Sequence, residues 1–175
     1  SLINKSEALF IGNKYNESKN VLLTLLKYKP IPEKLLLKAH LSLAYTYYNL
    51  NEYEEASKYF KIYVDRELKN KNEDIFNSDT YLRLADSYYA SKNFKKAIES
   101  YKKISEKKSD KNYLNYQIGL SYNGINRNNQ SIEFLDKVIN EGKNSLVDDA
   151  LFRKAQIYLE SSEFDNSILT QNKLI

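Results

Sequence analysis

Apolar and small residues recur along the chain at the spacing of helices that bury one face. Leu43, Ala44 and Tyr47 stand at relative positions i, i+1 and i+4, and a similar set follows after the short connection at residues 50–52. Positions three and four apart lie on one side of a helix, so each set predicts an amphipathic helix. Polar connections this short place consecutive helices antiparallel. The pattern predicts an all-α chain built from helical hairpins.

The same positions return in register in four segments of eighteen residues, at 43–60, 84–101, 118–135 and 154–171. The first small residues are Ala44, Ala85, Gly119 and Ala155, the tyrosines are Tyr47, Tyr88, Tyr122 and Tyr158, and the second small residues are Ala56, Ala97, Ser131 and Ser167. A degenerate copy with Tyr15, Ser18 and Leu22 lies 38 residues before the segment at 43–60. Self-similarity at such a period is the signature of a repeat array.

This pattern resembles the tetratricopeptide repeat, in which two antiparallel helices carry a small residue, a tyrosine, an alanine and an aromatic. The resemblance implies a right-handed α-solenoid of about five antiparallel helix pairs. We expect one array over residues 1–175, with approximate repeats at 2–29, 33–70, 78–108, 112–142 and 146–175. The chain departs from the family at the early tryptophan slot. That slot holds His40, Tyr81, Asn115 and Leu151.

Irregular spacing adds two expectations. The step from Ala44 to Ala85 is 41 residues, and the next two steps are 34 and 36. Because seven extra residues make about two helical turns, we expect the helix that ends near Lys69 to run long. Pro30 and Pro32 fit no helix interior and predict the break between the degenerate copy and the helical hairpin that follows it.

The first helix of each pair has a second face, opposite the packed one, and this face combines aromatic, apolar and charged residues. Such a composition is typical of protein-binding surfaces. The predicted groove residues are Leu41, Tyr45, Tyr48, Asn49, Leu82, Arg83, Asp86, Tyr89, Tyr116, Gln117, Leu120, Asn123, Phe152, Arg153 and Gln156. An alternative interpretation has Leu41, Leu82, Tyr116 and Phe152 pack between neighbouring repeats. Tyr45, Tyr48, Tyr89 and Leu120 are then the preferred contacts.

The resemblance implies a non-enzymatic scaffold that binds another protein in its concave groove. Tetratricopeptide modules that grip the acidic tails of chaperones line this groove with Lys and Asn, whereas Leu41 and Tyr45 stand at those places here. We therefore expect the ligand to be an apolar or helical segment of another protein, with no small-molecule substrate.

Catalytic and metal-binding chemistry finds little support in the composition. The chain has no Cys, and His40 is its one histidine, so no cofactor, metal site or catalytic residue is predicted. The pairs Glu54–Glu55 and Asp148–Asp149 point in directions about 100° apart on a helix and make no clamp. The second pair is expected near a helix start, where acidic side chains favour the helix dipole. An enzyme remains the weakest of the alternatives.

Lysine pairs give a second functional alternative. They are Lys95–Lys96, Lys102–Lys103 and Lys107–Lys108, and the net charge is +4. These residues predict a solvated outer face, or alternatively a salt-sensitive contact with nucleic acid or another polyanion. Arg, which dominates base readout, is scarce, so nucleic acid is the weaker hypothesis.

The stretch 144–153, with its Asp149-Ala150-Leu151-Phe152 sequence, resembles the connector of bacterial cell-envelope repeat proteins, among them the outer-membrane assembly lipoprotein and the coordinator of envelope constriction. The resemblance implies a periplasmic or outer-membrane-associated bacterial protein, with a cytoplasmic location as the alternative. The sequence has no Met and ends in an apolar pattern, so we expect a longer native chain, with which a lipid anchor is compatible.

Overall fold

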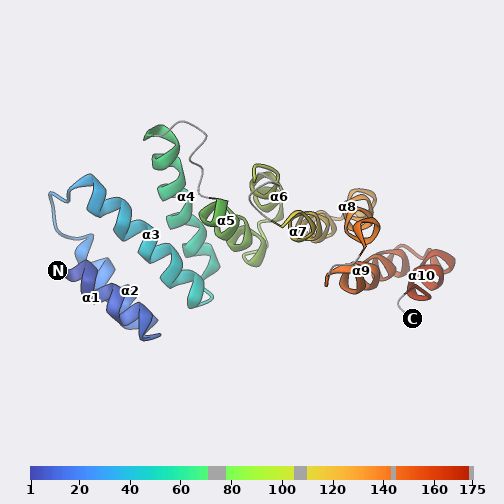
Figure 1. Ribbon diagram of the computed structural model, residues 1–175, viewed down its shortest axis with the longest axis horizontal. Helices are drawn as coiled ribbons and strands as arrows, with labels where there is room; N and C mark the ends of the chain where they lie inside the picture. Colours follow the sequence, from blue (N-terminus) through green and yellow to red (C-terminus); the bar gives the residue numbers. More distant parts are fainter. Residues whose placement is uncertain (71–77, 105–109, 143–144, 174–175) are drawn as a thin grey trace. The chain divides into compact units, whose positions relative to one another are not determined.

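The computed structural model describes residues 1–70, 78–104, 110–142 and 145–173, and within them every regular element is a helix (Figure 1). The chain divides into two compact units, Ser1–Ser91 and Lys92–Ile175, here the N-terminal and C-terminal units. The N-terminal unit contains α1 (Leu2–Ile11), α2 (Tyr15–Leu25), α3 (Glu33–Asn49), α4 (Tyr53–Asn70) and α5 (Ser78–Ala90). The C-terminal unit contains α6 (Phe94–Lys102), α7 (Lys111–Gly124), α8 (Asn128–Glu141), α9 (Val147–Glu160) and α10 (Phe164–Gln171). Within each unit, helices adjacent in sequence pack together.

The tight turns of the repeat share one backbone feature. Each contains a non-glycine residue in the left-handed region, with φ between 58° and 61°: Asn13, Asn51, Lys92, Asn126 and Ser162. Asn adopts this conformation more readily than most residues, and it fills three of the five positions. The residue after the turn donates a backbone hydrogen bond back to the preceding helix, as Glu52 N does to Tyr47 O at 2.9 Å. Within each unit the short connections thereby reverse the chain without a glycine at the left-handed position.

The second small position of the repeat joins the two helices of a hairpin in two ways. Where it is serine, the buried hydroxyl donates across the hairpin to the backbone carbonyl of the first small position. These bonds run from Ser18 to Ser6 (2.9 Å), from Ser131 to Gly119 (2.7 Å) and from Ser167 to Ala155 (3.0 Å). Where it is alanine, the methyl group is fully buried, as at Ala56 and Ala97. Both solutions need a small residue because the helices approach closely at this point.

Each unit has its own core. Leu22, Leu43 and Phe60 are fully buried in the N-terminal unit. In the C-terminal unit Leu135, Val138, Ala150 and Ile157 form a cluster that joins α8 to α9. The apolar faces that the sequence pattern predicts are therefore the faces that pack.

The irregular spacings have the predicted causes. Pro30 and Pro32 lie between the end of α2 and the start of α3, which confirms the predicted break. Helix α4 extends over 18 residues to Asn70, which confirms the long helix near Lys69. Asp148 and Asp149 lie in the first turn of α9, as predicted. The all-α repeat fold is confirmed, while the single array and its repeat bounds stay predictions.

Candidate functional site

Tyr45 on α3 is held from two sides. Its hydroxyl donates a 2.8 Å hydrogen bond to Asp79 Oδ2 on α5, and its ring meets the buried ring of Phe60 edge-on at 5.1 Å between centroids. Burial, together with the bond to the carboxylate, raises the pKa of Tyr45 to about 12. The phenol is therefore a neutral, oriented donor at ordinary pH, and its ring has a defined position on α3.

Tyr48, one turn further along α3, belongs to the same network. Its ring lies edge-on to Tyr53 at 5.5 Å, and the Arg83 guanidinium of α5 lies 5.5 Å from its centroid. Arg83 also pairs with the buried carboxylate of Asp86 at 3.4 Å. Burial raises the pKa of Tyr48, with Asp86 adding to the shift. The facing sides of α3 and α5 thus form one aromatic and charged network in the N-terminal unit.

An apolar hollow opens beside this network, between α1 and α3. Its volume is about 490 Å³, within the usual range of ligand pockets. The residues that line it are Ser6, Glu7, Phe10, Ile11, Ser18, Ser42, Tyr45 and Thr46. Ile11 is 81 % exposed, so a large aliphatic side chain is open to solvent beside the hollow. Phe10 keeps its ring in place by an edge-on contact with Tyr15 at 5.2 Å.

The sequence analysis did not select Phe10 and Ile11, although the signal was present. The degenerate first copy precedes the second by 38 residues, so Phe10 falls at the position of Tyr48 and Ile11 at that of Asn49. The same register therefore extends the groove face onto α1.

The predicted groove residues differ in exposure. Asn49 and Phe152 are exposed, and Asp86 is buried. Leu41, Tyr45, Tyr48, Leu82, Arg83, Tyr89, Tyr116, Gln117, Leu120, Asn123, Arg153 and Gln156 are partly buried. The structure brings Tyr45, Tyr48, Arg83 and Asp86 into one network. Partner binding by the whole set stays a prediction.

On the corresponding faces of α7 and α9 in the C-terminal unit, two buried polar atoms lack a hydrogen-bond partner among the described residues. Gln117 and Gln156 each bury a side-chain oxygen that has no hydrogen-bond partner among the described residues. Phe152 is 56 % exposed. Tyr116 instead packs against the cluster formed by α8 and α9, which agrees with the alternative interpretation for that residue.

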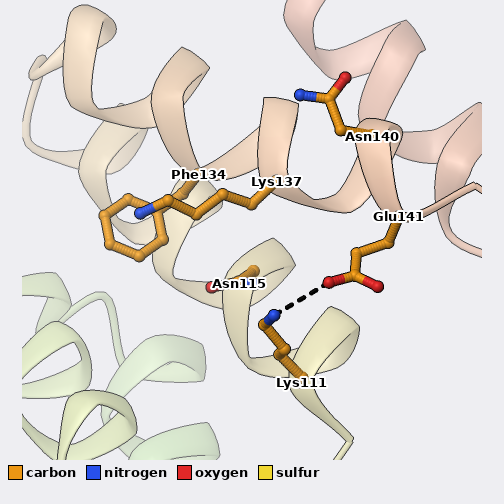
Figure 2. A pocket seen from close by; sticks show the side chains of 6 residues that line it. All are labelled: Lys111, Asn115, Phe134, Lys137, Asn140 and Glu141. Carbon is orange, nitrogen blue, oxygen red and sulfur yellow. Dashed lines mark hydrogen bonds and ion pairs between the residues drawn. The ribbon is translucent and has the colours of Figure 1, made fainter.

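A second hollow, with a polar lining, lies between α7 and α8 in the C-terminal unit (Figure 2). Its volume is about 750 Å³, and its lining residues are Lys111, Asn115, Phe134, Lys137, Asn140 and Glu141. Sequence reasoning noted Asn115 as a departure from the family pattern but assigned it no ligand.

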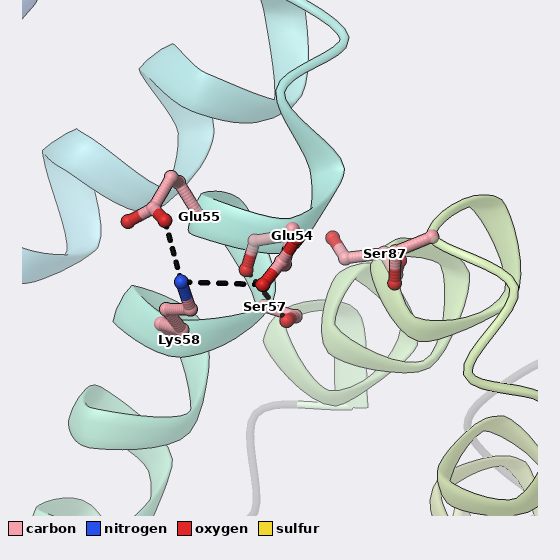
Figure 3. Close-up of polar contacts among 6 residues, drawn as sticks. Glu54, Glu55, Ser57, Lys58 and Ser87 are labelled. Atoms are coloured by element: carbon pink, nitrogen blue, oxygen red, sulfur yellow. Dashed lines mark hydrogen bonds and ion pairs between the residues drawn. The ribbon is translucent and has the colours of Figure 1, made fainter.

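The carboxylate pair Glu54–Glu55 forms ion pairs within α4. Both side chains turn toward Lys58 on the next turn of α4, at 3.4 and 2.6 Å from its Nζ (Figure 3). His40 is also structural: it is buried on α3, where its ring lies 5.8 Å from that of Tyr59. Among the described residues, no group of three or more His, Cys, Asp or Glu side chains is arranged to hold a metal ion.

The predicted lysine pairs include one residue that forms a contact within the chain. Lys95, Lys96 and Lys103 are exposed on or just after α6. Lys102 instead donates a 2.7 Å hydrogen bond to the Tyr122 hydroxyl. Lys107 and Lys108 lie outside the described residues, so binding of a polyanion stays a prediction. None of the helices described here has the length and hydropathy needed to cross a membrane.

Comparisons with known proteins agree with this architecture. Residues 37–67 and 79–107 each match a family model described as a tetratricopeptide repeat. No curated protein matches the sequence. Among solved structures, MamA (41-end) from Desulfovibrio magneticus RS-1 has a TM-score of 0.72 at 14 % identity, over 99 % of this chain and 90 % of that one.

Two further structures show the same fold. Another MamA structure gives a TM-score of 0.74 at 16 % identity, over 99 % of this chain and 87 % of the other. YrrB, described as a TPR protein with an unusual peptide-binding site, gives 0.73 at 14 % identity, over 99 % and 83 %. The chain thus carries tetratricopeptide repeats in an all-α solenoid fold, which is the fold of a non-enzymatic scaffold for protein–protein interaction.

Proposed function

We propose that the chain binds an apolar segment of another polypeptide in the hollow between α1 and α3. The observation that carries this proposal is the exposed Ile11 beside Phe10 and Tyr45, because these three side chains offer an open apolar surface with fixed aromatic walls. Burying an aliphatic side chain the size of Ile11 contributes about 1.5–3 kcal/mol. A partner that inserts one apolar side chain gains this term without reorganising the hollow.

The polar groups at the rim of the hollow are already paired within the chain. Glu7 lies on the rim and pairs with Lys38 at 2.7 Å, and the Tyr45 hydroxyl is already engaged by Asp79. The partner therefore meets few unpaired charges, which agrees with an apolar or helical ligand rather than a free carboxylate terminus. The network of Tyr48 and Arg83 extends the contact surface along α3 and α5.

The experiment is a peptide selection on the folded chain, followed by affinity measurements on two matched variants. Ile11→Ser removes the exposed aliphatic group and should raise the Kd of the selected peptide about tenfold. Tyr28→Ser removes a 61 % exposed aromatic from the same unit, outside the lining of the hollow, and should leave the Kd unchanged. Equal effects of the two variants, or selected peptides without apolar side chains, would contradict the proposal.

A bacterial cell-envelope location is a second part of the proposal. Its support is the resemblance of residues 144–153 to connectors of envelope repeat proteins. The complete reading frame tests it: a signal peptide or lipid-attachment motif ahead of the repeats is the expected result. Fractionation of the tagged native protein with the cytosol would contradict it.

A further inference from the structure

Exposed apolar side chains gather on the last hairpin of the C-terminal unit, where α9 and α10 pack side by side (Figure 1). Among the described residues, this hairpin carries most of the large apolar side chains that are exposed to solvent. They are Phe152, Leu159, Phe164, Ile168 and Leu169. Apolar side chains exposed together in one place mark an interaction surface, whereas single ones scattered over a protein do not.

The other copies of the repeat show what covers the position of Ile168. This residue is 55 % exposed, whereas Ile98, at the same repeat position on α6, is only 6 % exposed. Ile132, the equivalent residue on α8, packs against the cluster that joins α8 to α9. Both α6 and α8 are in contact with the first helix of the next hairpin. An α-helix is therefore the element that fits against this position.

Leu169 adds an observation that stacking of repeats does not explain. It is 64 % exposed, and the residues at its position in the other three copies are charged and exposed. They are Lys58, Glu99 and Glu133. Since that position stays open to solvent in copies that another helix follows, a neighbouring repeat does not cover it. An aliphatic side chain at such a position indicates a contact outside the repeat array.

Opposite charges flank Leu169 at equal distances along the chain. Asp165 lies four residues before it and Lys173 four residues after it, and both side chains are exposed. Residues four apart lie on one side of a helix, and the backbone keeps a helical conformation at Asn172, just beyond the end of α10. When two copies of this helix pair antiparallel about a two-fold axis at Leu169, Asp165 of each copy faces Lys173 of the other. The surface of α10 is therefore complementary in charge to itself.

The outer face of α1 is a poor alternative partner for α10. Ser1 and Lys5 are exposed there, at the repeat positions where α3 has the fully buried Ala39 and Leu43. A polar outer face is typical of the helix that caps a repeat array. Docking of α1 from a second copy on α10 would bury the Lys5 ammonium against apolar side chains, which is unfavourable.

We infer that α10 is a self-association surface, which pairs antiparallel with α10 of a second copy of this chain. Ile168 and Leu169 of the two copies lie at the centre of the contact, and the pairs of Asp165 with Lys173 at its two ends fix the register. The contact uses one short helix from each copy, so the dimer is weak and depends on concentration. The surface lies in the C-terminal unit and is independent of the apolar hollow between α1 and α3.

The test is sedimentation of the chain in the analytical ultracentrifuge at increasing concentration. We expect the average mass to rise from that of a monomer toward that of a dimer between about 10 µM and about 1 mM. Leu169→Lys keeps the fold, because an earlier copy has Lys58 at this position, and should raise the dimer Kd at least about tenfold. The matched control is Ile62→Lys, which changes an exposed aliphatic residue on α4 and should leave the Kd unchanged.

A charge exchange tests the antiparallel register. Asp165→Lys brings like charges together at both ends of the contact and should weaken the dimer, and adding Lys173→Asp to the same chain should restore it. A contact with a different protein or with another face of this chain has no reason to recover in the double variant. A chain that stays monomeric at about 1 mM, or equal Kd values for Leu169→Lys and Ile62→Lys, would overturn the inference. Failure of the double variant to recover would overturn the pairing of α10 with itself.

Discussion

The two units contain the same type of helical hairpin but carry different side chains at equivalent positions. In the N-terminal unit the slot beside Tyr59 is filled by His40, and the faces of α3 and α5 are joined by the network of Tyr45, Asp79 and Arg83. In the C-terminal unit the equivalent slot holds Asn115 and borders a hollow, and Gln117 buries an oxygen without a partner among the described residues. The repeat thus sets the positions of the helices, while single residues decide whether a slot is filled by a ring or borders a hollow.

The two hollows also differ in chemistry. The N-terminal hollow is apolar and has aromatic walls, whereas the C-terminal hollow is lined by lysines and amides. Each of the following changes alters one side of this comparison, in order of decreasing expected effect.

Removing the ring that supports the tyrosine face has the largest effect. Phe60 is fully buried and contacts the rings of both Tyr45 and Tyr48. Phe60→Ala should lower the free energy of unfolding by about 3–5 kcal/mol and also weaken peptide binding at temperatures where the chain stays folded. Leu135→Ala in the C-terminal cluster should cost about 2–5 kcal/mol without that loss of binding. Urea unfolding followed by circular dichroism measures the free energy of unfolding. Unchanged peptide affinity in Phe60→Ala would contradict a role of Tyr45 and Tyr48 in peptide binding.

Exchanging the second small residue has a smaller effect. Ser131→Ala removes the 2.7 Å hydrogen bond to Gly119 O and gives the C-terminal hairpin the alanine that the N-terminal hairpin has at Ala56. The free energy of unfolding should fall by about 1 kcal/mol, because a buried carbonyl loses one donor. Thermal unfolding monitors the change. A gain in stability would show that the bond from Ser131 to Gly119 O does not stabilise the hairpin.

Alkaline pH probes the Tyr45 bond. The pKa of Tyr45 is about 12 in the folded chain against 10 in the unfolded chain, so the unfolded chain releases this proton first as pH rises. The stability that Tyr45 contributes is complete below pH 10 and is lost between pH 10 and 12. Tyr45→Phe should flatten this part of the stability profile, measured by urea unfolding at a series of pH values. An unchanged profile would contradict the buried, bonded phenol.

Mildly acidic pH tests the contribution of His40, which fills the slot beside Tyr59. This change has the smallest expected effect on stability. Burial, and then the charge of Arg66, lowers the pKa of His40 from 6.5. The unfolded chain therefore takes up a proton first, and the stability from neutral His40 is complete above pH 6.5 and declines below it. His40→Asn, which copies the C-terminal slot, should reduce that decline. The difference between the two unfolding profiles is the measurement, and an equal acid slope in both proteins would show that His40 does not titrate in the predicted direction.

Most of the fold was predictable because the same sequence pattern occurs in several copies. Positions such as Ala44, Tyr47 and Phe60 recur in register, so errors at one copy are corrected by the others. The long α4 followed from the seven extra residues of one step. The face of α1 was missed because the first copy is degenerate, and its Phe10 and Ile11 emerge only when the register is extended by 38 residues.

The sites were less predictable because they depend on contacts that no spacing reveals. Periodicity assigned Tyr45 to the groove face, but its bond to Asp79 depends on how α3 and α5 pack. The same holds for Asn115: the sequence shows a departure from the family, and the structure is needed to show that a hollow borders it. A prediction from the pattern therefore names a face, while the geometry selects the residues that act.

Site-specific crosslinking to the selected peptide tests the apolar hollow most directly. A photoreactive benzophenone amino acid is placed at Ile11, beside Phe10 and Tyr45, or at the exposed Tyr28 as a control in the same unit. The account predicts an efficient crosslink from position 11 to the apolar residue of the peptide and little from position 28. Crosslinking from position 28 alone, or equal yields at both positions, would place the partner elsewhere and contradict the account.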